Sequence, residues 1–260
     1  MFDTTTNTGL NTATIIAQLT DTHLLSHPGD RQRGCNPWQS LKAVLRDIAA
    51  AQPDYLLLTG DIADAGELTA YQQAISLIVP LQIPTYWLPG NHDAIAPLFN
   101  SFTHPLFHPP QATILGNWQL VTVDSTLSRA CWGEGRLDRE SLQKLEERLQ
   151  RCHLPALIAL HHHPLLTGLD WLDSIALQNA DEFLALIDRF SHVRLVLFGH
   201  IHSTFAQKRG VTDFYGTPST CLQLHRENSK LGDRQPGFRL LHLHPDGTHK
   251  TEVRRVCVLT

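Results

Sequence analysis

Five short segments of the chain carry side chains that can bind metal ions, and each segment follows an apolar run. They are Asp21-Thr22-His23, Gly60-Asp61, Gly90-Asn91-His92-Asp93, the triplet His161 to His163, and Gly199-His200-Ile201-His202. In Asp-x-His and His-x-His, the two outer side chains point to the same face of an extended backbone and can bind one ion. Each segment alone is typical of a turn or a helix cap. Five together indicate a metal site.

The types of ligand restrict the metal. Carboxylate, amide and imidazole groups without a thiolate suit divalent Fe, Mn, Zn or Co. Six or seven such ligands exceed the need of one tetrahedral zinc ion. Two metals about 3.5–4 Å apart that share a carboxylate would use all of them. Such a pair is typical of phosphate ester hydrolysis, because two cations neutralise the phosphate oxygens and supply hydroxide at neutral pH.

The apolar runs that precede these segments have the length and composition of buried strands. Strands are predicted over residues 14–19, 55–60, 84–90, 118–123, 156–160 and 194–199. Helical periodicity lies between several of them, over residues 38–52, 67–80, 137–151 and 179–190. This alternation predicts a sandwich of sheets and helices, whose strand ends are the usual place for a ligand site. Residues 238–256 predict a hairpin that turns at Pro245-Asp246-Gly247.

Composition sets broader limits on the function. The 260 residues are 42% hydrophobic and 18% charged, which is typical of a globular protein. A net charge of -4 gives no basic surface for nucleic acid or a membrane. Without a signal-like N-terminus, we expect a cytoplasmic protein with a disordered lead-in over residues 1–14 and one domain over residues 15–260. The five scattered cysteines show no C-x-x-C spacing, which favours reduced thiols over disulfides.

The order and spacing of D-x-H, GD, GNHD, the histidine triplet and GHxH resemble the five sequence blocks of the calcineurin-like metallophosphoesterases. The resemblance extends from about residue 15 to the C-terminus. It implies a four-layer α/β/β/α sandwich with a dinuclear metal site at the strand ends. Residues 160–183, 215–224 and 235–248 further resemble the bacterial class III cyclic-nucleotide phosphodiesterases, which hydrolyse 3',5'-cyclic AMP.

The resemblance also implies roles for individual residues. One metal ion would be bound by Asp21, His23, Asp61 and His202, and the second by Asp61, Asn91, His162 and His200. The substrate would contact His23, Asp61, Asn91, His92 and His202. His92 would bind the phosphate or protonate the leaving oxygen. Asp93 would orient His92 through a hydrogen bond.

The implied activity is hydrolysis of 3',5'-cyclic AMP to 5'-AMP by in-line attack of a metal-bound hydroxide. Two divalent ions per chain are expected, Fe2+ and/or Mn2+, with Zn2+ or Co2+ as alternatives. One alternative function is a phosphodiesterase or phosphatase of broader or different specificity, acting on glycerophosphodiesters or 2',3'-cyclic nucleotides. A weaker one is a non-catalytic cyclic-nucleotide-binding or scaffold protein. We expect no nucleic acid or membrane partner. The sequence is compatible with a monomer or a homodimer.

Some positions allow two interpretations. Within the triplet, His162 stands two residues before Pro164, as the family ligand does, and His161 is the alternative because a local kink can change the face. We expect Asp64 to cap a helix, with substrate contact as the alternative. Asn179 either caps a helix or lines the nucleotide pocket. Trp171 either stacks on a base or packs in the core.

Overall fold

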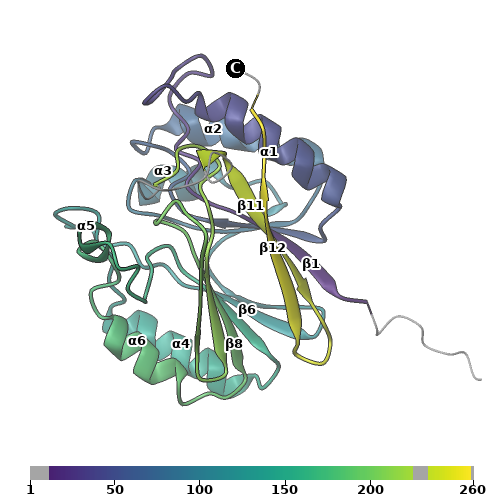
Figure 1. The fold of residues 1–260 in the computed structure, drawn as a ribbon, viewed down its shortest axis with the longest axis vertical. Coiled ribbons are helices and arrows are strands. Elements are labelled where there is room, and N and C mark those ends of the chain that lie inside the picture. The colour runs from purple at the N-terminus through teal and green to yellow at the C-terminus, as the bar shows by residue number, and fades with distance from the viewer. Residues whose placement is uncertain (1–11, 225–233, 259–260) are drawn as a thin grey trace, which may run out of the picture.

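Two six-stranded sheets lie face to face, and helices cover the outer face of each (Figure 1). The computed structural model describes residues 12–224 and 234–258. The predicted four-layer α/β/β/α sandwich is confirmed. Residues 1–11 of the predicted lead-in lie outside the described residues, and the first strand already begins at Thr14.

The first sheet has the strand order β12-β11-β1-β2-β3-β4. Its strands are β1 (Thr14–Leu19), β2 (Tyr55–Thr59), β3 (Thr85–Leu88), β4 (Phe107–His108), β11 (Gly237–Leu243) and β12 (His249–Arg255). It is covered by α1 (Pro37–Ala51), α2 (Leu68–Ile78), the 3-10 turn η1 (Val79–Leu81) and α3 (Ile95–Ser101). Strands β1 to β4 run parallel, so β1, β2 and β3 end at the same edge.

The second sheet has the strand order β5-β6-β7-β8-β10-β9. Its strands are β5 (Ala112–Leu115), β6 (Trp118–Thr122), β7 (Ala156–Ala159), β8 (Val193–Phe198), β9 (Phe205–Arg209) and β10 (Thr212–Gly216). Helices α4 (Arg139–Arg151), α5 (Asp170–Asp173) and α6 (Ala180–Ile187) belong to this half. All six predicted strands, the four predicted helices and the C-terminal hairpin are present. The β9–β10 hairpin, β4, β5, η1, α3 and α5 were not predicted.

The buried side chains of β7 alternate between two hydrophobic clusters. Leu157 and Ala159 pack between the sheets, whereas Ile158 and Leu160 pack against the helix layer of α4 and α6. This alternation is the two-residue period of an extended strand. It decides which way the residues directly after β7 point, and these are the histidines of the triplet.

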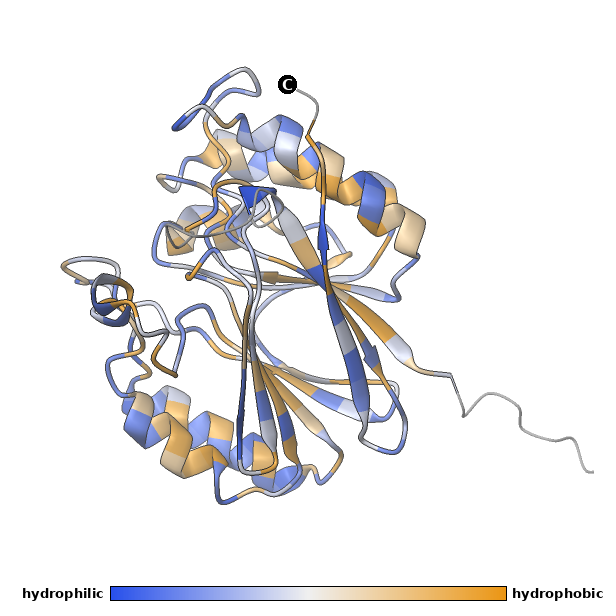
Figure 2. Cartoon of the chain, in the orientation of Figure 1, coloured by the Kyte–Doolittle hydropathy of each residue, from blue (hydrophilic) through white to orange (hydrophobic). Residues whose placement is uncertain are grey.

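Polar side chains mark the outside of the sandwich. The edge strand β12 is largely hydrophilic (Figure 2), and its residues alternate between exposed and half-buried. Charged and polar residues on an edge strand discourage pairing with other chains. Among the described residues, no helix is both long and apolar enough to cross a bilayer.

Candidate metal centre

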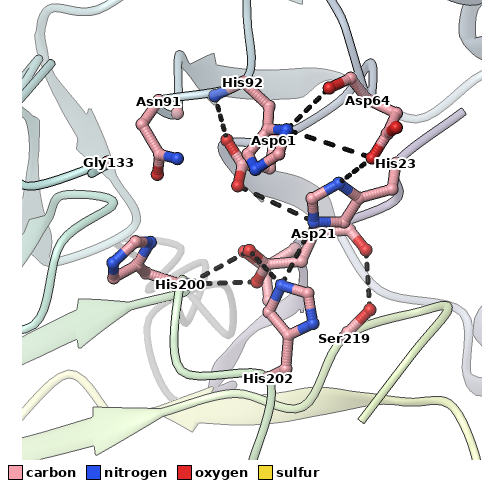
Figure 3. A network of polar contacts seen from close by, with 12 residues as sticks. Asp21, His23, Asp61, Asp64, Asn91, His92, Gly133, His200, His202 and Ser219 are labelled. Atoms are coloured by element: carbon pink, nitrogen blue, oxygen red, sulfur yellow. Dashed lines mark hydrogen bonds and ion pairs between the residues drawn. The ribbon is translucent and has the colours of Figure 1, made fainter. Parts of the chain in front are cut away.

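The predicted ligands come together where strands of both sheets end. Figure 3 shows those other than His162, namely Asp21, His23, Asp61, Asn91, His200 and His202. From the first sheet, Asp21 and His23 follow β1, Asp61 follows β2 and Asn91 follows β3. From the second sheet, the histidine triplet follows β7, and His200 and His202 follow β8. The parallel strands in each sheet therefore bring residues up to 181 positions apart into one cluster.

Five residues of this cluster have a left-handed backbone. Their φ angles are 52° at Asp21, 44° at His23, 51° at Asp61, 65° at His200 and 45° at His202. Positive φ is uncommon outside glycine, although Asp and His tolerate it better than most residues. Backbone hydrogen bonds between neighbouring loops hold this conformation, for example Asp21 N to Gly60 O at 3.0 Å and His23 N to Asp61 O at 3.0 Å. Unusual backbone angles concentrated in this way are typical of a functional site.

The first half of the centre consists of Asp21, His23, Asp61 and His202, whose ligand atoms lie within 4.8 Å of one another. His202 Nδ1 donates to the Leu222 carbonyl at 2.7 Å, and its Nε2 lies 3.2 Å from Asp21 Oδ1. His23 Nδ1 donates to Asp64 Oδ1 at 3.0 Å. The two Nε2 atoms of His23 and His202 then face each other at 3.1 Å.

That approach between the two nitrogens fits a metal ion. Because Nδ1 of each ring holds its proton on an acceptor, each neutral ring presents an Nε2 lone pair. Two lone pairs at this distance repel each other. A proton on His202, whose pKa Asp21 raises although burial opposes this, or a cation bound by both rings removes the repulsion. An Nδ1 proton held by a carboxylate or a carbonyl is also the usual support of a metal-binding histidine.

The second half of the centre is arranged around Asp61 and Asn91. His161 Nδ1 donates to the Thr59 carbonyl at 2.7 Å, and its Nε2 lies 3.1 Å from Asn91 Oδ1 and 3.3 Å from Asp61 Oδ2. His200 Nε2 donates to the Ile175 carbonyl at 3.0 Å, which leaves Nδ1 as its ligand atom. Carboxylate, amide oxygen and imidazole are a suitable donor set for a divalent ion.

The metal ligand of the triplet stays a prediction. The structure places His161, the alternative, beside Asp61 and Asn91, where we expected His162. A ring nitrogen of His162 lies within 4.8 Å of those of His161 and His200. However, His162 Nδ1 contacts Ser125 Oγ at 2.8 Å and its Nε2 contacts the Gly133 carbonyl at 3.1 Å. The alternation of β7 explains this, because His161 continues the inter-sheet face of Leu157 and Ala159.

Burial and neighbouring charges shift the pKa values of Asp61, His161 and His162 in different directions. Burial alone would raise the pKa of Asp61, but the attraction of His161 and His23 lowers it well below its usual value. Burial also opposes the charge of His161, yet Asp61 raises the pKa of that imidazole to about 9. The pKa of His162 is well below its usual value because it is buried beside His161. The buried carboxylates thus need positive charge, which a proton on His161 or bound cations can supply.

His92 lies at the edge of the centre with its side chain 42% exposed. Its backbone N–H donates to Asp61 Oδ1 at 2.8 Å, and its ring Nδ1 donates to the Asp64 carbonyl at 2.6 Å. The Nδ1 atom is thereby fixed, and Nε2 is left for a ligand. This is the arrangement that a proton donor to substrate needs.

Asp93 does not have the contact that the sequence suggested. Among the described residues it has no hydrogen bond to His92. Its carboxylate instead accepts from the backbone N–H groups of Ile62, Ala63 and Gly90 at 3.0–3.1 Å and from Tyr71 Oη at 3.2 Å. Burial and the nearby Asp61 raise its pKa to about 6. Asp93 therefore connects the loops that follow β2 and β3. The backbone carbonyl of Asp64, instead of the Asp93 carboxylate, orients His92.

Asp64 is not the helix cap that we expected, whereas Asn179 stands at the N-cap position of α6 without a capping hydrogen bond from its side chain. Helix α2 begins after Glu67, and the Asp64 carboxylate instead accepts from His23 and, at 2.8 Å, from Gln32 Nε2. The buried Asn179 side chain forms two hydrogen bonds with the backbone of Leu137 and none that caps α6. One feature of the sequence could have indicated that Asp64 supports the metal centre. It stands three residues after Asp61, on the loop that also carries this predicted ligand.

A cavity of about 360 Å3 opens over the centre. It is lined by all five predicted substrate-contacting residues, His23, Asp61, Asn91, His92 and His202, and also by Asp64 and His200. The rest of its lining includes Arg33, Trp132 and Trp171. Trp132 is 85% and Trp171 53% exposed, so Trp171 is not a core residue. Sequence reasoning missed Trp132 and Arg33, because neither lies in a recognisable block.

Comparison with known proteins agrees with this geometry. Residues 14–204 match the family model described as calcineurin-like phosphoesterase. A 3',5'-cyclic-nucleotide phosphodiesterase of Nostoc sp. is 38% identical over 93% of this chain and 92% of its own. The 3',5'-cyclic adenosine monophosphate phosphodiesterase CpdA of Escherichia coli is 37% identical over 93% of this chain and 89% of its own. A dimetal phosphatase from Danio rerio has a similar fold, with a TM-score of 0.68 at 11% identity over 95% of this chain and all of its own.

Proposed function

The chain belongs to the calcineurin-like phosphoesterase family, and we propose on that premise that it hydrolyses 3',5'-cyclic AMP to 5'-AMP with two divalent metal ions. The observation that carries the proposal is the position of Asp61. Its carboxylate lies between the ring nitrogens of His23 and His161 at the floor of an open cavity. Relatives at 37–38% identity that are named for cyclic-nucleotide hydrolysis support the choice of substrate.

In this proposal each metal ion has four protein ligands. Asp21, His23, Asp61 and His202 hold one ion, and Asp61, Asn91, His161 and His200 hold the other. When bound, such a pair neutralises phosphate oxygens and lowers the pKa of a water molecule. Fe2+ or Mn2+ suits the mixed oxygen and nitrogen ligands, and Zn2+ or Co2+ can replace them.

His92 supplies the proton for the leaving 3' oxygen. With Nδ1–H held on the Asp64 carbonyl, the imidazolium form donates from Nε2 and then remains as the neutral Nδ1–H tautomer. General acid catalysis of this kind contributes ~10²–10⁴-fold to the rate. A His92→Ala variant should therefore lose this factor in kcat while it keeps its full metal content.

The two exposed tryptophans at the cavity are the proposed binding surface for adenine. Stacking of a base on an aromatic side chain contributes about 1–3 kcal/mol. A Trp171→Ala variant should raise the KM for cyclic AMP roughly tenfold, which corresponds to about 1.4 kcal/mol. Its kcat/KM for a small aryl phosphodiester, which lacks the base, should change little.

The function is tested by removing metal from the protein, adding Mn2+ and measuring product release from several substrates at equal metal content. Cyclic AMP should be hydrolysed to 5'-AMP with a higher kcat/KM than 2',3'-cyclic AMP, a glycerophosphodiester or bis-p-nitrophenyl phosphate. Good cleavage of the aryl diester without release of AMP would favour the alternative of a phosphodiesterase with a different substrate. Binding of cyclic AMP without hydrolysis of any ester would favour a receptor.

A further inference from the structure

Two cysteines meet beside the metal centre. Cys221 Sγ donates to Cys35 Sγ at 3.0 Å. Both are free thiols, with Cys35 half-buried and Cys221 buried. They are 186 positions apart in the sequence, so only the fold brings them together. An S–S bond of about 2.05 Å would require the two sulfur atoms to move closer by roughly 1 Å.

A second cavity, of about 630 Å3, reaches this pair of thiols. Both cysteines line it, together with Asn36, Gln39 and Ser40. Three arginines also line it, namely Arg31, Arg33 and Arg234. The cavity therefore gives small molecules access to Cys35, and its guanidinium groups favour anionic ones.

The two thiols are not chemically equivalent. The hydrogen bond from Cys221 lowers the pKa of Cys35, and Arg31 adds to this effect although burial opposes it. The same hydrogen bond and burial raise the pKa of Cys221 above its usual value. A thiolate is the nucleophile in thiol–disulfide exchange, so Cys35 is the attacking group and Cys221 the second one.

We propose that Cys35 and Cys221 form a reversible modification site that takes an anionic small-molecule disulfide from the arginine-lined cavity. The Cys35 thiolate attacks one sulfur of that disulfide, forms a mixed disulfide and releases one thiolate. Cys221 gives up its proton to the first thiolate, attacks the Cys35 sulfur and releases the second thiolate, which takes a proton from solvent. The products are a Cys35–Cys221 disulfide and two small thiols, so the two electrons lost by the protein reduce the small disulfide.

The segments that carry this pair also support the metal centre. Three residues before Cys35, Gln32 Nε2 donates to the Asp64 carboxylate that holds His23. Next to Cys221, the Leu222 carbonyl holds Nδ1 of His202. Two residues before Cys221, Ser219 Oγ donates to the Asp21 carbonyl at 2.7 Å. A bond between the two segments thus shifts the supports of three ligands of one metal ion.

The site is tested on the full-length protein with oxidised glutathione, which is anionic, and with cystamine, which is cationic. After exposure and alkylation of the remaining thiols, oxidised glutathione should lower the number of free thiols from five to three. Peptide mapping should find Cys35 linked to Cys221, and dithiothreitol should reverse the change. Cystamine should react at least tenfold more slowly. Glutathione that stays attached to Cys131 or Cys257, without the internal bond, would overturn the proposal.

Variants identify which groups carry the reaction. Cys35→Ser should prevent modification of Cys221, whereas Cys221→Ser should stop at a stable mixed disulfide on Cys35. Cys152→Ser, a control at a thiol outside the pair, should form the internal bond at the wild-type rate. Arg31→Gln should slow the reaction with oxidised glutathione more than the reaction with uncharged hydroxyethyl disulfide. Equal slowing by both reagents would contradict a role for charge in the cavity.

The effect on the metal centre has its own measurement, and it rests on the proposed ligands. Changes in the groups that support metal ligands alter metal affinity ~10–100-fold. The oxidised protein should therefore hold Mn2+ about tenfold more weakly in equilibrium dialysis and recover after reduction. Unchanged Mn2+ binding by fully oxidised protein would overturn the link to the metal centre. The thiol count needs no turnover, so failure of the proposed substrate would not affect it.

Discussion

The two sheets contribute different chemistry to the metal centre. Strands of the first sheet supply both carboxylates and the amide, Asp21, Asp61 and Asn91, together with His23. Strands of the second sheet supply only imidazoles. Those that face the carboxylates are His161, His200 and His202. Negative charge is therefore confined to one side, and imidazole groups face it from the other.

This division shows what a metal ion adds to the sandwich. Between the sheets, the interior is apolar and includes Leu57, Leu88, Leu157 and Leu197. At the strand ends, buried carboxylates replace this apolar contact and need compensating positive charge. A cation bound by ligands of both sheets joins them at the edge where hydrophobic contact ends. Metal binding should therefore stabilise the fold as well as supply the chemistry.

The largest effect is expected where the two halves share a ligand. Asp61→Ala should lower kcat by on the order of 10³-fold or more and leave less than one metal ion per chain, measured by metal analysis. Asp124→Ala is the control, because Asp124 also follows a strand and is half-buried but its carboxylate accepts from Thr126. An Asp61 variant with two bound ions and normal turnover would disprove the shared ligand.

The next largest effect separates two neighbours on the imidazole side. His161→Ala should remove one metal ion and lower kcat by ~10²–10³-fold. His162→Ala should keep both ions, since its ring contacts Ser125 and Gly133 instead of the carboxylates. Metal content and turnover of the two variants are measured side by side. Loss of metal in the His162 variant alone would restore the ligand predicted from the sequence.

A smaller effect is expected from the carboxylate that supports His23. Asp64→Asn removes the charge but keeps a similar shape, and the backbone carbonyl that holds His92 remains. The affinity for the first metal ion should fall by ~10–100-fold, measured by competition with a chelator. At saturating metal, kcat should return to within a few-fold of the wild-type value. If added metal did not restore kcat, Asp64 would instead act directly on the substrate.

The smallest effect on activity is expected at the third histidine of the triplet, which affects stability instead. Among the described residues, both ring nitrogens of His163 are buried without a hydrogen-bond partner, and Nε2 lies 3.7 Å from Asp173 Oδ1. Burial lowers the pKa of this imidazole from 6.5 to about 4, although Asp173 opposes the shift. As the pH falls, His163 binds a proton in the unfolded chain before it does so in the folded one. The free energy of unfolding therefore decreases between pH 6.5 and pH 4. The total loss is about 3 kcal/mol. In metal-free protein, His163→Phe should make urea unfolding less sensitive to pH in this range. An unchanged pH dependence would contradict a buried neutral His163.

The sequence predicted the strands and the ligand types because both leave local signals. Apolar runs such as residues 194–199 and pairs such as His200 and His202 can be read from a few neighbouring residues. The choice between His161 and His162 could not be read in this way. All four residues from Leu157 to Leu160 are apolar, so no polar position shows which face of β7 meets the other sheet.

Contacts between segments far apart in the chain could not be predicted from the sequence either. Asp64 supports His23 because β1 and β2 are neighbours in the sheet, and the Asp64 carbonyl holds His92 because β2 and β3 are neighbours. The β9–β10 hairpin was missed because β9 is mostly polar and exposed and shows little hydrophobic alternation. A reverse turn at Gly210 was its one local signal.

The left-handed backbone at five metal-centre residues sets a conflict between stability and activity. At Asp21, His23, Asp61, His200 and His202, glycine would suit the backbone without strain. Substitution there would remove a ligand but relieve a conformation that costs of order 1 kcal/mol per residue. In the absence of metal, selection for thermal stability alone would thus favour loss of the metal centre, one position at a time. A screen of metal-free variants by melting temperature without an activity measurement would enrich inactive proteins at these five positions.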